Sequence, residues 1–458
     1  MHADREAQAI VGDANVLTGE QVRSRAVGWA DRRPCQAKAI VRPGSTDEVS
    51  RVLAECHASG QPVVLFGGLT GLVQGSVASE HELALSLERM HRIETIDPVG
   101  RTMTVEAGVA VQRIQEEAEK HGLLYPVDFG ARGSAHIGGS AATNAGGNGV
   151  IRYGMTRESV LGLEAVLADG TVIPAMNRMI KNNAAYDVKQ LFIGTEGTLG
   201  VITRLVLRLR ESPRSTQSAL VACPTFADVT RFLKHIDGSL GGSLSAFELM
   251  WNGFYRMVTT PPSKGTPPLP QTYDYYVLVE SAGGDPTRDQ AQFEEAIAGA
   301  IDAGLVVDAV VCSSEAQRDA LWALRDDVEG IFRLGMPVAF DVSLPLAEME
   351  GYVTEVVGRL EREWPAYCRF VFGHLGDGNL HIIAAGPPSA EARHGIERCV
   401  YEPLASRGGS VSAEHGIGRE KQPWLNLCRS PAEIALMRKL KQALDPKGIL
   451  NPGRVLPG

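Results

Sequence analysis

The sequence lacks the features of a membrane, secreted or nucleic-acid-binding protein. No apolar run approaches the roughly 20 residues of a membrane span, because the longest candidate, 298–311, is interrupted by Asp302 and Asp308. The seven cysteines are odd in number and none form a C-x-x-C pair, so we expect a reducing compartment and no disulfide framework. The net charge of −9 gives no basic excess for nucleic acid. We therefore expect no membrane span and no nucleic-acid partner.

The N-terminus also lacks targeting signals. It carries Asp4, Glu6 and Asp13 without an apolar stretch, which argues against a secretory signal. It is too acidic for a typical mitochondrial presequence. We therefore predict a cytoplasmic protein.

Glycine is abundant, with 50 residues in a chain of 458. The composition, 44% apolar and 22% charged, is typical of globular proteins. Changes in sequence pattern predict a helical lead-in over residues 1–36, a first domain over 37–212, a second over 213–405 and a C-terminal segment over 406–458. The second domain contains two strand–helix units and is predicted to be α+β.

Local patterns predict several elements. A helix is expected over 46–59, with Thr46 as its N-cap and Gly60 as its stop. Asp169-Gly170 predicts the turn of a hairpin. Other strands are expected at 39–41, 62–66, 83–87, 102–105, 161–168, 171–173, 201–209, 219–223 and 275–280, and helices at 226–236 and 288–303.

Three long glycine-rich loops lie within the first 200 residues, at Gly67–Ser76, Ile137–Gly149 and Gly194–Gly200. Such loops leave backbone N–H groups uncovered and can form anion-binding nests. One loop alone could equally be a tight turn, but three favour a large phosphate-bearing cofactor. No Walker pattern occurs, and no G-x-G-x-x-G stands between a strand and a helix, so a Rossmann nicotinamide site is not supported.

Two histidines flank a favoured hairpin turn, Asp377-Gly378. With that dipeptide as the turn centre, His374 would lie directly opposite His381, with Cβ atoms roughly 4.5–5.5 Å apart. Two imidazoles could bind one divalent metal, and Glu414 is the best third ligand. This ligand set suits Zn²⁺, and also Mn²⁺, Fe²⁺ or Co²⁺. His415 would point the other way in an extended segment. The alternative is that both histidines make ordinary hydrogen bonds.

Arg325 lies on a predicted helix and could clamp a carboxylate. The alternative is a solvated helix arginine paired with Asp319 or Glu329, which the sequence alone supports equally well. Asn379, like Asp377, could simply be a turn former.

Together these motifs resemble FAD-dependent D-2-hydroxyacid dehydrogenases of the p-cresol-methylhydroxylase/vanillyl-alcohol-oxidase superfamily, closest to D-2-hydroxyglutarate and D-lactate dehydrogenases. The resemblance implies a two-part FAD-binding domain, an α+β cap (substrate) domain with an antiparallel sheet, and a C-terminal segment that returns to the FAD domain. The motifs that carry it are Gly67–Ser76, Ile137–Gly147, Arg152-Tyr153-Gly154, Leu191–Gly200, Gly373–His381, Ser412–Gly418 and Leu444–Pro452.

The resemblance also assigns site residues. It implies His415 and Arg325 as catalytic residues, and His374, His381 and Glu414 as ligands of one divalent metal, zinc first. No histidine stands beside Gly67-Gly68, which predicts non-covalent FAD, although His136 precedes the second loop. The residues implied in FAD binding are Gly67, Gly68, Leu69, Thr70, Gly71, Leu72, Gly75, Ser76, Ile137, Gly138, Gly139, Ala142, Thr143, Asn144, Gly147, Tyr153, Gly154, Glu196, Gly197, Gly200, Ile202, Asn379 and Asn451.

The substrate prediction rests on three departures. Where D-2-hydroxyglutarate dehydrogenases carry Thr, Lys and Asn for the second carboxylate, this chain has Glu329, Ala339 and Ile383. Losing a cation and gaining an anion should disfavour a dicarboxylate. We therefore predict oxidation of a D-2-hydroxy monocarboxylate, such as D-lactate or one with a larger apolar side chain, to its 2-oxoacid.

Other functions remain open at this stage. They are a D-2-hydroxyglutarate dehydrogenase proper, an O₂-using 2-hydroxyacid oxidase, and a flavin subunit that assembles with iron–sulfur partners. A dehydrogenase would pass its electrons to a quinone or an electron-transfer protein. The sequence is compatible with a homodimer.

Overall fold

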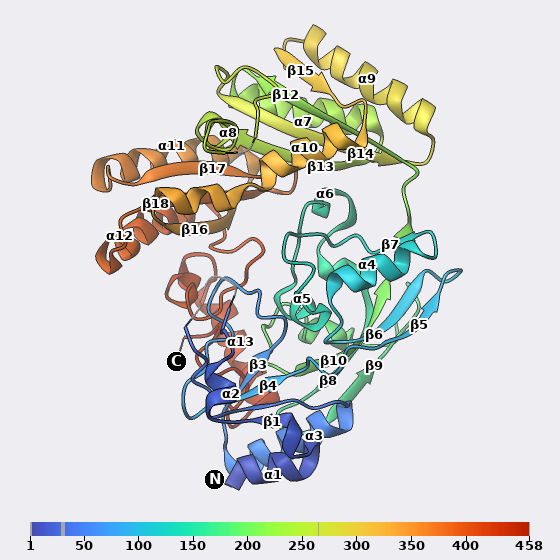
Figure 1. Cartoon of the computed structure of the whole chain (residues 1–458), viewed down its shortest axis with the longest axis vertical. Coiled ribbons are helices and arrows are strands. Elements are labelled where there is room, and N and C mark those ends of the chain that lie inside the picture. The colour runs from blue at the N-terminus through green and yellow to red at the C-terminus, as the bar shows by residue number, and fades with distance from the viewer. Residues whose placement is uncertain (1, 29–32, 264, 458) are drawn as a thin grey trace. The chain divides into compact units, whose positions relative to one another are not determined.

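A computed structural model describes residues 2–28, 33–263 and 265–457 (Figure 1). The chain divides into two units. Unit 1 comprises Met1–Gly147, Gly154–Ser212 and Glu414–Gly458, and unit 2 comprises Asn148–Tyr153 and Pro213–Ala413. The chain therefore leaves unit 1 twice and returns to it each time. Among the described residues, no helix combines the length and apolar character needed to cross a bilayer.

Unit 1 begins with a four-stranded sheet in the order β1-β2-β4-β3. β2 (Ala39–Val41), β3 (Val63–Phe66) and β4 (Leu83–Ser86) run parallel, and β1 (Val16–Leu17) pairs antiparallel with β2. Parallel strands of one sheet need a crossover connection, and helix α3 (Thr46–Ser59) supplies it between β2 and β3, which lie on either side of β4. α3 and α1 (His2–Val11) bury apolar side chains in the core of this sheet.

The N-terminus of α3 differs from the prediction. Ser45, not Thr46, is the N-cap, and its hydroxyl accepts the N–H of Glu48 at 3.2 Å. Thr46 instead donates its hydroxyl to Glu164 at 2.6 Å, so its side chain serves a tertiary contact. Gly60 ends the helix as predicted, in the left-handed conformation (φ 68°) that glycine adopts readily.

The second sheet of unit 1 has five antiparallel strands in the order β5-β6-β10-β8-β9. Val166 of β8 pairs with Val172 of β9 across the Asp169-Gly170 turn, which confirms the predicted hairpin. Helices α4 and α5 contribute to the core of this part. The bounds are β5 (Ile93–Asp97), β6 (Thr102–Glu106), β8 (Val160–Val166), β9 (Val172–Ala175), β10 (Val201–Arg208), α4 (Val111–Glu119) and α5 (Ile137–Thr143).

Shorter elements complete unit 1. The expected lead-in over 1–36 contains α1, β1 and α2, and its residues 29–32 lie outside the described residues. The last long helix, α13, belongs to the C-terminal stretch. These elements are α2 (Glu20–Arg23), β7 (Leu123–Leu124), β11 (Arg210–Glu211), α13 (Pro431–Leu444) and the 3-10 helices η1 (Asp13–Asn15), η2 (Thr156–Ser159), η3 (Val188–Leu191) and η7 (Gln422–Leu427).

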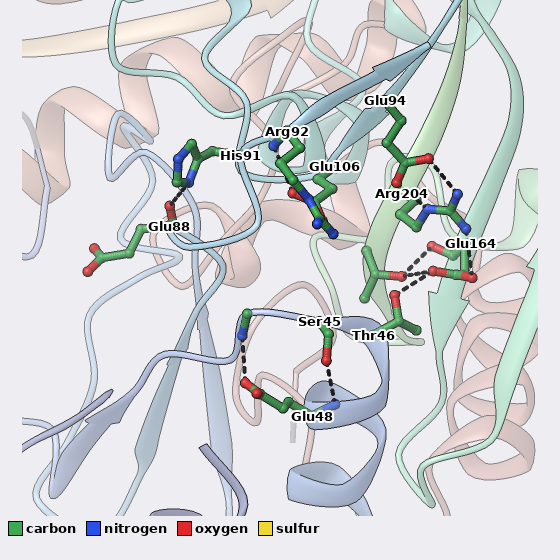
Figure 2. Close-up of polar contacts among 12 residues, drawn as sticks. Ser45, Thr46, Glu48, Glu88, His91, Arg92, Glu94, Glu106, Glu164 and Arg204 are labelled. Atoms are coloured by element: carbon green, nitrogen blue, oxygen red, sulfur yellow. Dashed lines mark hydrogen bonds and ion pairs between the residues drawn. The ribbon is translucent and has the colours of Figure 1, made fainter. Parts of the chain in front are cut away.

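A polar network links helix α3 to the five-stranded sheet of unit 1 (Figure 2). Glu164 of β8 is 7% exposed and accepts hydrogen bonds from Thr46 at the start of α3 and, at 2.9 Å, from the buried hydroxyl of Thr203 in β10. Arg204 lies 3.4 Å from Glu164 and makes a two-point pair with Glu94 of β5. Glu164 is therefore the centre of the network.

Unit 2 contains one seven-stranded sheet in the order β15-β12-β14-β13-β17-β18-β16. Every recorded pairing in it is antiparallel, as the resemblance implied for the cap domain. The strands are β12 (Ser215–Cys223), β13 (Leu244–Trp251), β14 (Tyr275–Gly283), β15 (Asp308–Val311), β16 (Met336–Ser343), β17 (Cys368–His374) and β18 (Asn379–Gly386).

Helices cover both faces of this sheet. On one face, α7 packs Phe232 against Phe247 of β13, and α12 packs Tyr401 against Phe340 of β16. On the other, α8 stacks Phe254 on Phe372 of β17, with ring centroids 4.1 Å apart. The bounds are α6 (Val150–Tyr153), α7 (Phe226–Leu240), α8 (Asn252–Thr259), α9 (Pro286–Asp302), α10 (Glu315–Asp326), α11 (Leu346–Glu363), α12 (Ala390–Tyr401), η4 (Val328–Leu334), η5 (Leu375–Asp377) and η6 (Glu402–Arg407).

We predict that Glu164→Ala destabilises unit 1 by about 2–3 kcal/mol, because it leaves the buried Thr203 hydroxyl without its acceptor. Thermal unfolding would show a midpoint several degrees below the wild type. Glu94→Ala is the matched control, since it breaks a more exposed ion pair and should cost about 0–1 kcal/mol. Equal losses in the two variants would contradict a central role for Glu164.

Candidate active site

The three glycine loops of unit 1 surround a cavity of ≈ 380 Å³. Its lining includes every residue of the first loop that was predicted to bind FAD, and Asn451. From the second and third loops it includes Gly138, Gly139, Ala142, Thr143, Glu196, Gly197 and Gly200, and from β10 it includes Ile202. The loops that sequence analysis grouped by composition therefore meet in space.

The other predicted FAD residues do not line this cavity. Ile137 is fully buried in the core, and Asn144 ends α5 and accepts the N–H of Arg157 at 2.9 Å. Gly147 and Gly154 are also absent from the lining. Tyr153 and Asn379 belong to unit 2.

The cavity walls are largely bare backbone. A Cβ atom on Gly68 would lie 1.9 Å from the carbonyl oxygen of Ser134, so only glycine fits there. A Cβ atom on Gly139 would meet no protein atom within 4 Å and would enter the cavity. Leu69 and Glu196 adopt left-handed backbone angles, which residues with side chains rarely do outside functional loops. This open, glycine-lined wall fits a long phosphate-bearing ligand such as FAD.

Sequence analysis missed Arg454, which also lines the cavity. Its side chain is fully buried and pairs with Glu82 at 2.7 Å. Its Nε and Nη2 donate to the carbonyl oxygens of Gly75 and Val77, at 3.3 and 2.5 Å. Arg454 thus fixes the end of the first glycine loop. Its only sequence signal is its place two residues after Pro452.

Two predicted catalytic-centre residues line the same cavity. These are Glu414, the predicted metal ligand, and His415, the predicted base. Glu414 accepts the N–H of Gly147 through Oε1 at 2.7 Å. His136 also lines the cavity, and within the described residues its Nδ1 has no hydrogen-bond partner. Burial lowers the pKa of His136, which favours its neutral form.

In unit 2, His374 and His381 lie on the same face of the sheet, with ring centroids 5.4 Å apart. The predicted register was wrong by two residues, because Phe372 is the residue that pairs with His381. The turn is longer than Asp377-Gly378, since Leu375–Asp377 forms a 3-10 turn before Gly378. A shift of two keeps the side chain on the same face. Two adjacent imidazoles remain a donor set that fits a divalent metal.

Arg325 is not a solvated helix arginine, so that alternative was wrong. It is 6% exposed, and its Nε donates to Glu248 Oε2 at 2.8 Å. Glu248 also accepts a hydrogen bond from His374 Nδ1 at 2.7 Å. Burial raises the pKa of Glu248, but the charge of Arg325 and the hydrogen bonds from His374 and Arg325 outweigh burial and lower it. Glu248 is therefore an anion between two predicted functional groups.

Glu248 and Asp341 escaped the sequence analysis. Asp341 of β16 pairs with His381 of β18 and is fully buried. Its Oδ1 accepts from Asn379 Nδ2 at 2.8 Å, whereas Asn379 Oδ1 has no partner within the described residues. The same sequence feature could have identified both acids. Each is a single carboxylate within an apolar strand, and a buried carboxylate seldom lacks a partner.

The three positions on which the substrate prediction rests also lie in unit 2. Ala339 of β16 pairs with Ile383 of β18, on the same sheet face as His381. Ala339 is exposed and Ile383 is buried, while Glu329 is exposed on η4. The structure therefore brings together Arg325, His374 and His381 in one unit, and Glu414 and His415 in the other. That these two groups form a single centre stays a prediction.

Family models match both parts of the chain. The model described as "FAD binding domain" matches residues 37–175, and "FAD linked oxidases, C-terminal domain" matches residues 212–455. The second model alone covers more than half of the chain.

Curated relatives align over nearly the whole sequence. The D-2-hydroxyglutarate dehydrogenase of Bos taurus, named as mitochondrial, is 40% identical over 98% of this chain and 82% of its own length. The D-2-hydroxyglutarate dehydrogenase of Xanthomonas citri pv. viticola is 38% identical over 93% of this chain and 91% of its own. A putative mitochondrial D-lactate dehydrogenase of Schizosaccharomyces pombe is 36% identical, with 93% and 83% covered.

Solved structures share the fold at low identity. p-Cresol methylhydroxylase superposes with a TM-score of 0.79 at 16% identity, covering 99% of this chain and 96% of its own. Alkyldihydroxyacetonephosphate synthase gives 0.78 at 17%, covering 98% and 85%. These structures show that the chain shares the fold of p-cresol methylhydroxylase. The family models and the curated relatives show that it belongs to the FAD-linked oxidases, as an FAD-dependent 2-hydroxyacid dehydrogenase.

Proposed function

We propose that this chain oxidises the C2 hydroxyl of a D-2-hydroxyacid to the 2-oxoacid, with non-covalent FAD and one divalent metal. The observation that carries the proposal is the cluster on one face of the unit 2 sheet, where His374 and Arg325 both bond to Glu248 and His381 lies beside His374. A metal-binding pair beside a carboxylate-binding arginine suits a substrate that has both a hydroxyl and a carboxylate.

The cofactors would be held by different parts of the chain. FAD, when bound, supplies the two-electron acceptor for the C2 hydride, and the glycine-lined cavity of unit 1 would hold it. The metal, with Zn²⁺ as the first candidate, would be held by His374, His381 and Glu414. A metal lowers the pKa of a hydroxyl bound to it. Glu414 as third ligand rests on the sequence resemblance. Protein groups then have to orient the substrate and accept its proton.

Two side chains have these roles in the proposal. Arg325 binds the substrate carboxylate, and its guanidinium is oriented for this by the bond from Nε to Glu248. His415 takes the hydroxyl proton as general base, a role that imidazole suits near neutral pH. His415 lines the FAD cavity of unit 1, which supports its assignment.

The comparisons favour D-2-hydroxyglutarate over the monocarboxylate that the sequence predicts, since most of the similar curated proteins are named as D-2-hydroxyglutarate dehydrogenases. We therefore take D-2-hydroxyglutarate as the first substrate candidate. A monocarboxylate such as D-lactate is the second candidate. It is favoured by the Ala339–Ile383 pair, which puts two alkyl groups and no cation on the sheet face of His381.

The electron acceptor and the cellular location are further proposals. We propose a quinone or an electron-transfer protein as acceptor, and a cytoplasmic location, as the sequence predicts.

Two measurements test the alternative functions. Peroxide formation at a rate that matched dye reduction would support the O₂-using oxidase. Turnover by the purified chain alone would exclude a subunit whose role is assembly only.

The proposed function predicts that D-2-hydroxyacids bleach the flavin of the purified yellow protein under anaerobic conditions. Rates should be higher for D- than for L-enantiomers and should fall when a chelator removes the metal. A higher kcat/KM for D-2-hydroxyglutarate than for D-lactate would support the first candidate, and the reverse order the second. Absence of bleaching by every 2-hydroxyacid in the panel would overturn the proposal.

Ala339→Lys should shift the preference towards a dicarboxylate, because it places a cation where the second carboxylate is expected. We predict that the kcat/KM ratio of D-2-hydroxyglutarate to D-lactate rises about tenfold, equivalent to about 1.4 kcal/mol. Ala339→Met is the matched control, with a long side chain and no charge. An equal shift in both variants would show that size, and not charge, is responsible.

His415→Ala should slow flavin reduction by about 10²–10⁴-fold, since it removes the general base. Anaerobic stopped-flow absorbance measures this step in a single turnover. FAD content and substrate affinity should stay near wild type, because neither role belongs to this side chain. A reduction rate equal to that of the wild type would remove His415 from the mechanism.

A further inference from the structure

Glu248 lies in the middle of β13 with 1% of its surface exposed. Its two carboxylate oxygens are used separately. Oε1 accepts from His374 Nδ1 at 2.7 Å, and Oε2 accepts from Arg325 Nε at 2.8 Å. One buried carboxylate thus joins a predicted metal ligand to the predicted substrate-binding arginine.

The contact between His374 and Arg325 identifies the tautomer of His374. Its Nε2 lies 3.1 Å from Nη2 of Arg325. A guanidinium can only donate hydrogen bonds, so Nε2 must carry the lone pair. The ring proton is then on Nδ1, where Glu248 accepts it. The opposite tautomer would set N–H against N–H at Arg325 and a lone pair against the carboxylate.

We propose that Glu248 is the positioning residue of the metal centre. A metal binds imidazole through a nitrogen lone pair, and a carboxylate on the other nitrogen commonly fixes the ring. Glu248 holds His374 with that lone pair on Nε2, where a metal would replace the N–H of Arg325 Nη2, and it keeps Arg325 in place through Nε with the same carboxylate. This inference rests on the proposed function, in which His374 is a metal ligand, and it adds the group that decides whether the ligand is correctly presented.

The chemistry of this position requires a carboxylate. Glu248 accepts hydrogen bonds on both sides, from an imidazole N–H and a guanidinium N–H. A glutamine has one oxygen to accept with, and its amide N–H groups would face one of the two donors. Glu248→Gln therefore keeps the size of the side chain but loses one of the two bonds and the negative charge.

The chain offers a matched control on the same sheet face. Glu280 of β14 is 8% exposed and accepts from Arg318 and Trp322 of α10 at 2.8 and 3.0 Å. Arg325 lies on this same helix. Glu280→Gln thus removes a buried carboxylate that anchors α10, without altering any group that contacts His374 in the recorded bonds.

The test measures metal affinity and needs no turnover. The FAD-loaded wild type, Glu248→Gln and Glu280→Gln are stripped of metal, and Zn²⁺ is titrated against a chromophoric chelator. Glu248→Gln should bind Zn²⁺ about 10–100-fold more weakly than the wild type, whereas Glu280→Gln should match it. Unfolding midpoints of both variants, measured in parallel, show how much each loses in stability alone.

Three outcomes would overturn the inference. Wild-type Zn²⁺ affinity in Glu248→Gln would do so, as would equal losses in both variants, which would indicate a structural role. Absence of Zn²⁺ binding by the wild type would refute the metal centre of the proposed function itself, and the positioning role with it. This outcome is distinct because it needs no variant.

A second measurement avoids any folding defect of the variant. The ¹⁵N spectrum of histidine-labelled, metal-free wild type should show His374 protonated on Nδ1 and unprotonated on Nε2, assigned by its loss in His374→Gln. The opposite tautomer would contradict the proposed role of Glu248.

Discussion

The carboxamide of Asn451 holds together the loops on which the FAD cavity depends. Its Oδ1 accepts the N–H of Leu65 at 2.9 Å, just before the first glycine loop, and its Nδ2 donates to the carbonyl of Glu196 in the third loop at 2.6 Å. Its own N–H donates to Val63 at 2.8 Å. Asn451 thus joins two distant segments, β3 and the third loop, to the C-terminal stretch. A flavin-binding wall made of bare backbone has few side chains of its own to fix it, so it depends on such external bonds.

The rest of the C-terminal stretch acts in the same way. Arg454 binds the end of the first loop, and its ion pair with Glu82 is almost completely buried. Lys441 of α13 donates to the carbonyl oxygens of Thr198 and Leu450. Burial lowers the pKa of Lys441, and its pair with Asp445 opposes that shift. Return of the chain to unit 1 therefore supplies side-chain donors that fix the first and third loops of the cavity.

Sequence reasoning succeeded where a local pattern has a local cause. Helix α3 with its glycine stop, the Asp169-Gly170 hairpin and the meeting of three glycine loops follow from periodicity, turn chemistry and backbone exposure. It failed where the answer depends on a distant partner. Thr46 has the residue type of an N-cap, but its hydroxyl instead bonds to the distant Glu164. The register of His374 depends on a 3-10 turn that the Asp377-Gly378 dipeptide does not predict. Glu248 is one acidic residue in an apolar strand, and its partners lie 77 and 126 residues away in the sequence.

Buried carboxylates fasten α10 to the sheet of unit 2 at two points, Glu280 and Glu248. Apolar residues of similar volume often stabilise a fold as well as buried ion pairs do, because desolvation of the charges offsets their attraction. Stability is therefore a weak reason for two such pairs on one helix. Orientation is a better one, since a carboxylate fixes a guanidinium in direction as well as in place. Glu280 sets the position of the helix, and Glu248 sets the direction of Arg325 and the tautomer of His374. In the proposed mechanism, these bonds would orient both groups before substrate binds.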